Sequence, residues 1–220
     1  MRVEGTKELE DALVDALNSA LANNKLVLWL IPGGSNIVTA IKVMDRIESG
    51  DMSKLTIALT DERFGEPGHK DSNFYQLSQG GFKTRGAVFI DLLKGGSFLD
   101  TIKASGEEMK KIFTYAEELI GFFGIGSDGH IAGILPHSPA AVSDEAWMIG
   151  YDAGQFKRVT LTPFAISHVR TAFIGAYGPE KLDALTILQD KMLPVEEQPA
   201  QILKHLPEAF IYNNQLGERP

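Results

Sequence analysis

The chain has 220 residues, a hydrophobic content of 44% and a formal net charge of −8. The acidic balance argues against a nucleic-acid partner, because contacts to a phosphate backbone need a basic surface. Cysteine is missing, which excludes disulfides, thiolate metal sites and a thiol nucleophile.

Amphipathic segments and short apolar runs alternate along the first half of the chain. The predicted helices are 6–24, 35–48, 72–79 and 97–113, and the predicted strands are 25–31, 55–60, 87–91 and 119–125. None of the apolar runs approaches the length of a membrane span, so we expect no membrane partner. The first residues lack the layout of a signal peptide, which favours a cytoplasmic location.

The second half predicts a hairpin and then a return to alternating elements. Two short strands at 145–151 and 156–161 are joined through Asp152-Ala153-Gly154, and Pro163 opens a short helix. The remaining predictions are strands at 171–176 and 209–212 and helices from 179 to about 189 and at 199–206. Because strands alternate with helices almost throughout, the sequence predicts a single α/β domain over residues 1–220. We expect a doubly wound, mainly parallel sheet with helices on both faces.

A two-glycine loop joins a predicted strand to a predicted helix. Gly33 and Gly34 end the first strand region, and the helix is predicted to begin at Ser35. Free N–H groups and the positive end of the helix dipole would then meet at one point, which is a physical anion site. An ordinary turn with a serine cap has the same pattern, so the loop alone is a weak signal.

Another glycine-rich loop, Gly124–His130, follows the central apolar run and carries one carboxylate and one imidazole. A carboxylate two residues before a histidine, at the carboxyl end of a strand, lies where open α/β sheets place their chemistry. In the alternative interpretation Asp128 caps the next segment and His130 is merely packed. The spacing does not decide between the two.

Charged residues at three further places admit a similar choice. Asp61, Glu62 and Arg63 follow a strand and form either a solvated rim, which is the usual case, or the wall of a pocket. Lys181 falls in the first turn of a predicted helix, where a cation opposes the helix dipole. Taken singly, Lys181 and Arg158 fit ordinary solvated surface charges.

Together these motifs resemble the 6-phosphogluconolactonases, relatives of glucosamine-6-phosphate isomerase/deaminase. The family's Ser-Gly-Gly-Ser-Thr-Pro is similar to Pro-Gly-Gly-Ser-Asn-Ile at 32–37, and its Gly-X-Gly-X-Asp-Gly-His-Thr-Ala is similar to residues 124–132. Its Asp-Glu-Arg matches 61–63, and its Asp-Ser-Asn-Tyr matches 71–74 with phenylalanine last. Two shorter stretches also fit, at 158–162 and 178–181. The resemblance covers nearly the whole chain in the right order.

Two branches of the family differ in sequence. The deaminases resemble one another in the motif Asp-Gly-His-Ile-Ala-Phe-Asn-Glu. At the position of its glutamate this chain has Leu135, and a proline follows as in the lactonases. Deaminases also tend to carry tyrosine where this chain has Arg63, whereas Ile131 leans towards the deaminases. Asn36 and Ile37 depart from the family's first loop, which affects side-chain contacts but not backbone N–H groups.

The resemblance implies hydrolysis of 6-phospho-glucono-1,5-lactone to 6-phosphogluconate, a step of the pentose phosphate pathway, without a metal or cofactor. His130 is the expected general base, because the pKa of imidazole lies near neutrality. Either Asp128 or Asp61 would orient His130, and Arg63 would stabilise the carbonyl oxygen or hold the substrate. The expected substrate- and phosphate-binding residues are Gly33, Gly34, Ser35, Asn73, Arg158 and Lys181.

Two other functions stay open. One is a glucosamine-6-phosphate isomerase/deaminase, and the other is a non-catalytic, sugar-phosphate-binding regulatory module. In each case the expected partner is a small anionic sugar phosphate. The sequence leaves the oligomeric state open.

Overall fold

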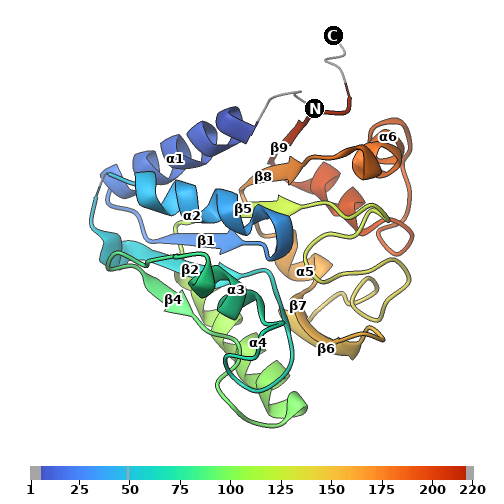
Figure 1. Cartoon of the computed structure of the whole chain (residues 1–220), viewed down its shortest axis with the longest axis horizontal. Helices are drawn as coiled ribbons and strands as arrows, with labels where there is room; N and C mark the ends of the chain where they lie inside the picture. The colour runs from blue at the N-terminus through green and yellow to red at the C-terminus, as the bar shows by residue number, and fades with distance from the viewer. Residues whose placement is uncertain (1–5, 49, 217–220) are drawn as a thin grey trace.

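The computed structural model describes residues 6–48 and 50–216, which form two sheets with surrounding helices (Figure 1). The larger sheet has six parallel strands in the order β4-β2-β1-β5-β8-β9. Its strands are β1 (Val27–Ile31), β2 (Leu55–Leu59), β4 (Val88–Ile90), β5 (Glu118–Gly124), β8 (Thr171–Ala176) and β9 (Glu208–Asn213). The predicted parallel α/β sheet is therefore confirmed.

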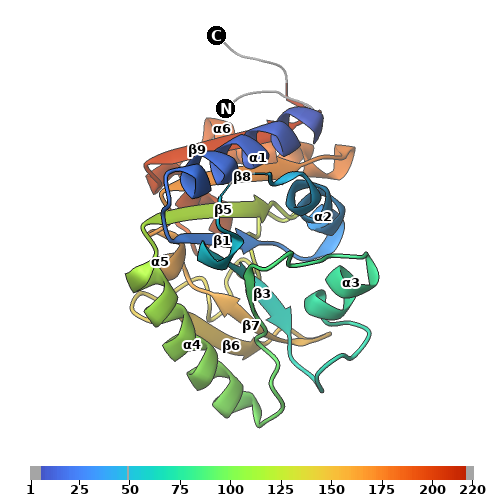
Figure 2. The same ribbon diagram turned by 90° about the vertical axis from the view of Figure 1, so that its left-hand side faces the viewer.

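The strand order reverses between β1 and β5. After β1 the sheet grows in one direction through β2 and β4, and after β5 it grows in the other through β8 and β9. Figure 2 shows β1 and β5 side by side. Their carboxyl ends form the topological switch point, where doubly wound sheets bind their ligands.

Helices flank the larger sheet on both sides. On one side α1 (Thr6–Ala22) contacts β5, β8 and β9, and it also packs against α2 (Ile37–Arg46). The short helix α5 (Pro163–Ile166) lies on the other side of β5 from α1 (Figures 1 and 2). Central strands buried on both faces read as continuous apolar runs, which is why β1 and β5 were visible in the sequence.

A smaller antiparallel sheet has the order β3-β7-β6 and stands beside the larger one. Its strands are β3 (Asp61–Arg63), β7 (Lys157–Leu161) and β6 (Met148–Asp152). The predicted hairpin is confirmed as β6 and β7. The sequence predicted one sheet, with the preceding strand ending at residue 60; instead there are two sheets, and Asp61, Glu62 and Arg63 form a strand of their own that pairs with β7.

Local capping explains where several of the remaining helices begin. Ser72 accepts a hydrogen bond at the start of α3 (Asn73–Gln79), Ser97 at the start of α4 (Phe98–Tyr115) and Thr162 at the start of α5. The predicted helix at 199–206 is the 3-10 helix η4 (Pro199–His205). A 3-10 turn, η3 (Pro179–Lys181), precedes α6 (Leu182–Asp190), so Lys181 stands at the N-cap of α6.

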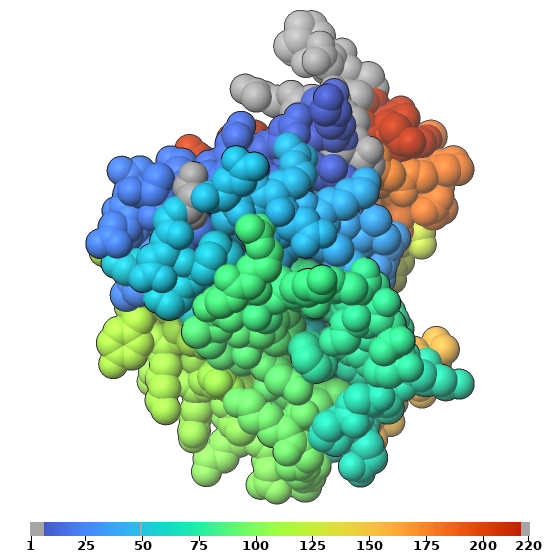
Figure 3. Space-filling model, turned by 60° about the vertical axis from the view of Figure 1, so that its left-hand side comes forward, coloured from blue at the N-terminus to red at the C-terminus, as the bar shows by residue number. Residues whose placement is uncertain are grey.

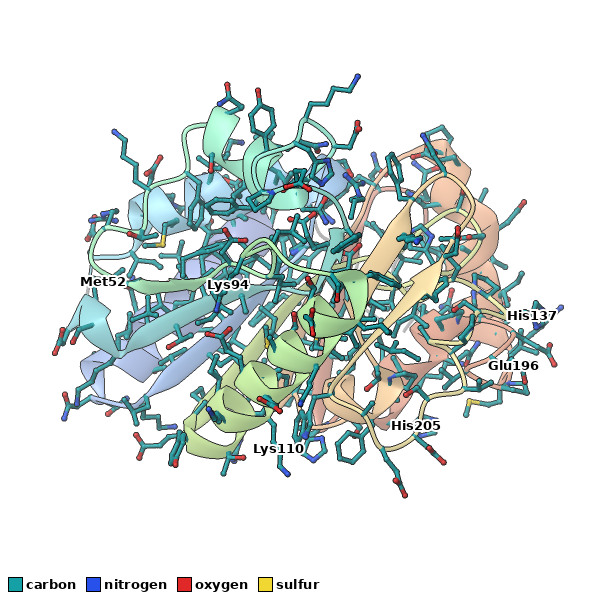
Figure 4. All side chains as sticks on the ribbon, turned by 90° about the horizontal axis from the view of Figure 1, so that it is seen from below. Met52, Lys94, Lys110, His137, Glu196 and His205 are labelled. Carbon is teal, nitrogen blue, oxygen red and sulfur yellow. The ribbon has the colours of Figure 1, made fainter. Side chains whose placement is uncertain are left out.

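The outer surfaces complete this description. In Figure 3 the amino-terminal half of the chain fills one face, with α1 and α2 above the segments that contain α3 and α4. Figure 4 shows α4 running alongside β6 and β7, which agrees with the contacts between α4 and β6. Within the described ranges, no helix combines the length and apolar character needed to cross a bilayer.

Candidate active site

A cavity of about 400 Å³ opens at the switch point, where the loops after β1 and β5 meet the smaller sheet. All the predicted site residues line it except Asp128, which contacts His130 instead. The lining residues from the prediction are Gly33, Gly34, Ser35, Asp61, Arg63, Asn73, His130, Arg158 and Lys181. Segments far apart in the sequence thus meet around one crevice.

His130 and Asp128 form a hydrogen-bonded pair. His130 Nδ1 lies 2.6 Å from Asp128 Oδ1, and the His130 backbone N–H donates to the same oxygen at 3.1 Å. The hydrogen bond from His130 lowers the pKa of Asp128 to about 2. The carboxylate therefore accepts a proton-bearing Nδ1, which leaves Nε2 available as a base.

The glycines of this loop allow the pair to form. A side chain at Gly126 would collide with the imidazole of His130, so only glycine fits there. Gly129 has a φ of 81°, and its N–H donates to the Gly126 carbonyl at 3.0 Å. The His130 side chain is 34% exposed and lines the cavity, so the alternative of a merely packed histidine is wrong.

The second carboxylate, Asp61, has a different partner. Its Oδ2 lies 3.1 Å from Nη1 of Arg158, and the two side chains are only 7% and 17% exposed. Of the two carboxylates proposed to serve His130, the structure therefore pairs Asp128 with it and Asp61 with Arg158. The alternative of Arg158 as a solvated strand charge is wrong.

One face of the smaller sheet forms a wall of the cavity. Residues directly opposite one another on paired strands project from the same face. Asp61 is opposite Thr160, and both Arg63 and Tyr151 are opposite Arg158. Polar side chains from all three strands consequently share this face, and Asp61, Arg63 and Arg158 reach the cavity.

Glu62 projects from the opposite face of β3 and is completely buried. It accepts hydrogen bonds from the backbone N–H groups of Arg63 and Asn73 at 2.7 Å each, and from Phe74 N–H and Ser72 Oγ at 3.0 Å each. Burial raises its pKa despite these bonds. Glu62 is thus neither a solvated rim nor a pocket residue but a cap that binds α3 to β3.

The first residue of α3 connects this cap to the cavity. Asn73, the first residue of α3, donates from Nδ2 to the Asp61 carbonyl at 2.8 Å and lines the cavity. Sequence reasoning missed this role of Glu62. No local pattern reveals it, because its hydrogen-bond donors at the start of α3 lie about ten residues further along the chain.

The glycine loop presents a helix start without a side-chain cap. Gly34 has a φ of 68° and opens the 3-10 turn η1 (Gly34–Asn36), which leads into α2. The alternative of a serine cap is wrong, because neither η1 nor α2 has a side-chain cap. The departure at Asn36 has a structural role, since its Nδ2 donates to the Gly175 carbonyl at the end of β8 at 3.0 Å.

The cavity is positively charged on an acidic protein. Three cationic side chains, Arg63, Arg158 and Lys181, line it with one carboxylate, Asp61. Arg63 donates from Nη1 to the Asp71 carbonyl at 2.9 Å, and its guanidinium lies 5.7 Å from the ring centre of Phe156. The excess of positive charge in a chain of net charge −8 favours an anionic ligand.

The other four histidines do not line this cavity. His69 Nε2 lies 2.9 Å from the Arg63 carbonyl, and His168 packs among aromatic rings that include Trp147. His137 lies 4.0 Å from Glu196, and Figure 4 shows both at the surface, with His205 elsewhere on the same side. Among the residues the structure describes, no group of three or more histidine, aspartate or glutamate side chains is arranged to hold a metal.

The fold and cavity define a doubly wound α/β protein with a cationic crevice at its switch point and a histidine–carboxylate pair at the crevice wall. A family model described as glucosamine-6-phosphate isomerases/6-phosphogluconolactonase matches residues 2–211. The chain belongs to this family.

Individual relatives agree with the family match. The 6-phosphogluconolactonase of Borreliella burgdorferi is 26% identical over 217 residues, which cover 94% of this chain and 91% of that protein. That of Neisseria meningitidis serogroup A is 26% identical over 190 residues, covering 81% and 80%. A solved 6-phosphogluconolactonase from Shewanella baltica shares the fold with a TM-score of 0.78 at 21% identity, covering 96% of this chain and 94% of that one.

Proposed function

We propose that the chain hydrolyses 6-phospho-glucono-1,5-lactone to 6-phosphogluconate in the pentose phosphate pathway. The observation that carries the proposal is the His130–Asp128 pair, which stands at the wall of a cationic cavity. Membership of the family and the names of the curated relatives support the same activity.

In the proposed reaction His130 acts as the general base. Its Nε2 takes a proton from water while the oxygen bonds to the lactone carbonyl carbon. The bond between that carbon and the ring oxygen then breaks, and the imidazolium returns the proton to the ring oxygen. The product is an open-chain hydroxy acid that ionises in water. Asp128 holds Nδ1–H and stabilises the imidazolium.

The remaining cavity residues have proposed electrostatic roles. Arg63 stabilises negative charge on the carbonyl oxygen or holds the substrate. The phosphate binds at the helix start formed by Gly33, Gly34 and Ser35, with Lys181 as a charged partner.

Two polar side chains complete the proposed substrate contacts. Arg158, already paired with Asp61, adds a second cation for the phosphate, and Asn73 contributes an amide from the start of α3. These steps use neither a metal ion nor a redox cofactor. We therefore expect a chelator to leave the rate unchanged.

A direct assay tests the proposal. Freshly generated 6-phosphogluconolactone hydrolyses spontaneously, so its uncatalysed rate provides the baseline against which acid release is followed. Acceleration in proportion to protein concentration is the expected result. Thermal stabilisation by the sugar phosphate without turnover would instead indicate a regulatory binding module.

The deaminase alternative is tested by measuring ammonia release from glucosamine 6-phosphate. We expect none, because the deaminases' glutamate position is Leu135, an apolar side chain packed against the core. Ammonia release with no lactone turnover would assign the chain to the other branch of the family.

A further inference from the structure

Ala132 has an unfavourable backbone conformation next to the cavity. It lines the cavity two residues after His130 and has a φ of 52°, in the left-handed region that L residues rarely adopt. The turn that contains it is closed by the Ile134 N–H, which donates to the Ile131 carbonyl at 2.9 Å. Turns that need a positive φ normally use glycine there. Something in the surroundings must therefore hold Ala132 in place.

The next residue, Gly133, is held at both ends of its backbone unit. Its N–H donates to Thr160 Oγ1 at 2.9 Å, and its carbonyl accepts from the Tyr151 hydroxyl at 2.6 Å. Both hydrogen bonds are buried. A side chain at position 133 would come within 2.9 Å of Cβ atoms of both Asp61 and Thr160, which explains the glycine at this position.

Both hydroxyl groups come from the smaller sheet, Tyr151 from β6 and Thr160 from β7. They share the face that carries Arg158 into the cavity. The sheet that supplies both arginines of the cavity is thus also the sheet that holds the loop of His130.

We propose that Tyr151 and Thr160 are positioning residues that fix Gly133, hold Ala132 in its left-handed conformation and so set the place of His130 relative to the cations of the smaller sheet. We call Tyr151, Thr160 and Gly133 the Gly133 clamp. Its consequence for catalysis rests on the proposed lactone hydrolysis, whereas its consequence for the geometry of His130 does not.

Loss of one clamp hydroxyl should lower the catalytic rate but leave substrate binding unchanged. Without Tyr151 or Thr160 a buried backbone group of Gly133 has no partner, and Ala132 is free to relax to a negative φ. His130 then shifts away from the attacking water, and small misplacements of a catalytic group lower the rate strongly. The arginines stay on β3 and β7, so binding of the anionic substrate persists.

Kinetics of clamp variants test the proposal. We expect Tyr151→Phe and Thr160→Val to lower kcat by about tenfold or more, with KM changed by less than about twofold. Thr160→Ser, which keeps the hydroxyl, should behave as the wild type. The matched control is Ser105→Ala, which removes a buried hydroxyl that donates to the Thr101 carbonyl in α4. A Thr160→Val variant as active as Ser105→Ala, or a Thr160→Ser variant as impaired as Thr160→Val, would overturn the clamp.

A second measurement does not depend on turnover. In ¹⁵N-labelled protein the imidazole signals of His130, assigned by their loss in His130→Gln, should move in Tyr151→Phe and Thr160→Val but not in Ser105→Ala. If the wild type proves inactive on the lactone, the proposed function fails while these signals still decide the clamp. Unchanged signals in both variants would refute it.

The role of Ala132 can be tested separately. Glycine adopts a positive φ without support. In an Ala132→Gly background the effect of Tyr151→Phe on the His130 signals should therefore shrink. An equal effect in both backgrounds would contradict the strained-residue part of the proposal.

Discussion

Replacing Glu62 by glutamine tests whether a buried carboxylate holds the cavity wall together. Oε1 accepts from Arg63 N–H and Asn73 N–H, and Oε2 accepts from Ser72 Oγ and Phe74 N–H. A glutamine NH₂ group at either position faces at least one backbone N–H and cannot accept from it. A buried donor left without a partner costs about 1–3 kcal/mol.

Two further terms modify this estimate. The remaining bonds lose the strengthening that a charged acceptor provides. In the opposite direction, a neutral amide avoids the desolvation that raises the pKa of Glu62. The net expectation is a loss of about 2 kcal/mol, which lowers Tm by roughly 4–8 °C in a chain of this size.

The assay is thermal denaturation followed by circular dichroism, with Glu10→Gln as the matched control. Glu10 is another largely buried carboxylate, but its partners are Lys42 at 3.0 Å and Arg46 at 3.8 Å, and both cations are about half exposed. Such pairs contribute about 0–1 kcal/mol each. A Glu62→Gln variant no less stable than Glu10→Gln would refute the capping role.

The pH dependence gives this prediction a second signature. Because the pKa of Glu62 is raised in the folded state above its ordinary value of 4.5, the folded chain binds this proton more tightly than the unfolded chain. The contribution of Glu62 to stability therefore falls as pH rises from about 4.5 through the folded pKa. Glutamine does not titrate, so the difference in free energy of unfolding between the wild type and Glu62→Gln should become smaller towards neutral pH. A difference that grows towards neutral pH would contradict a raised pKa of Glu62 in the folded state.

Other substitutions test the proposed roles in the cavity. His130→Ala should lower kcat by about two to four orders of magnitude, and a loss confined to KM would reject the general base. Lys181→Ala should weaken inhibition by inorganic phosphate with little change in Tm, and unaltered inhibition would remove Lys181 from the phosphate site. Arg158→Ala should weaken the same inhibition and also lower the free energy of unfolding by about 3–5 kcal/mol, because Asp61 is left buried without its partner; an unchanged Tm would contradict this. As pH falls from about 4 towards 2, the wild type should lose stability relative to Asp128→Asn, since its carboxylate has a lowered pKa. Parallel acid-denaturation curves for the two proteins would argue against the hydrogen bond between His130 and Asp128.

Elements built from local patterns were predictable from the sequence. The strand β8 coincides with its prediction at 171–176, and α4 begins where Ser97 caps it. Motifs at the ends of β1 and β5 also indicated the crevice, because parallel strands bring their carboxyl ends together.

Contacts between distant segments were not predictable in the same way. The strand β3 consists of Asp61, Glu62 and Arg63, which lack the apolar alternation of a half-buried strand. It pairs with β7, whose residues lie about a hundred positions later in the chain. The hydrogen bonds of Glu62 to the start of α3 and of Tyr151 to Gly133 also had no signal in the sequence, because no local pattern marks partners that lie 10 to 18 residues away.

The pairing of β3 with β7 also has a consequence for synthesis of the chain. Asp61 and Arg158 are 97 residues apart, so at ribosomal rates of about 5–20 residues per second β3 waits roughly 5–20 s for its neighbour. An apolar strand left unpaired for so long would be a template for aggregation. The acidic and basic side chains of β3 make it a poor template, so the composition that conceals this strand in the sequence also protects the nascent protein.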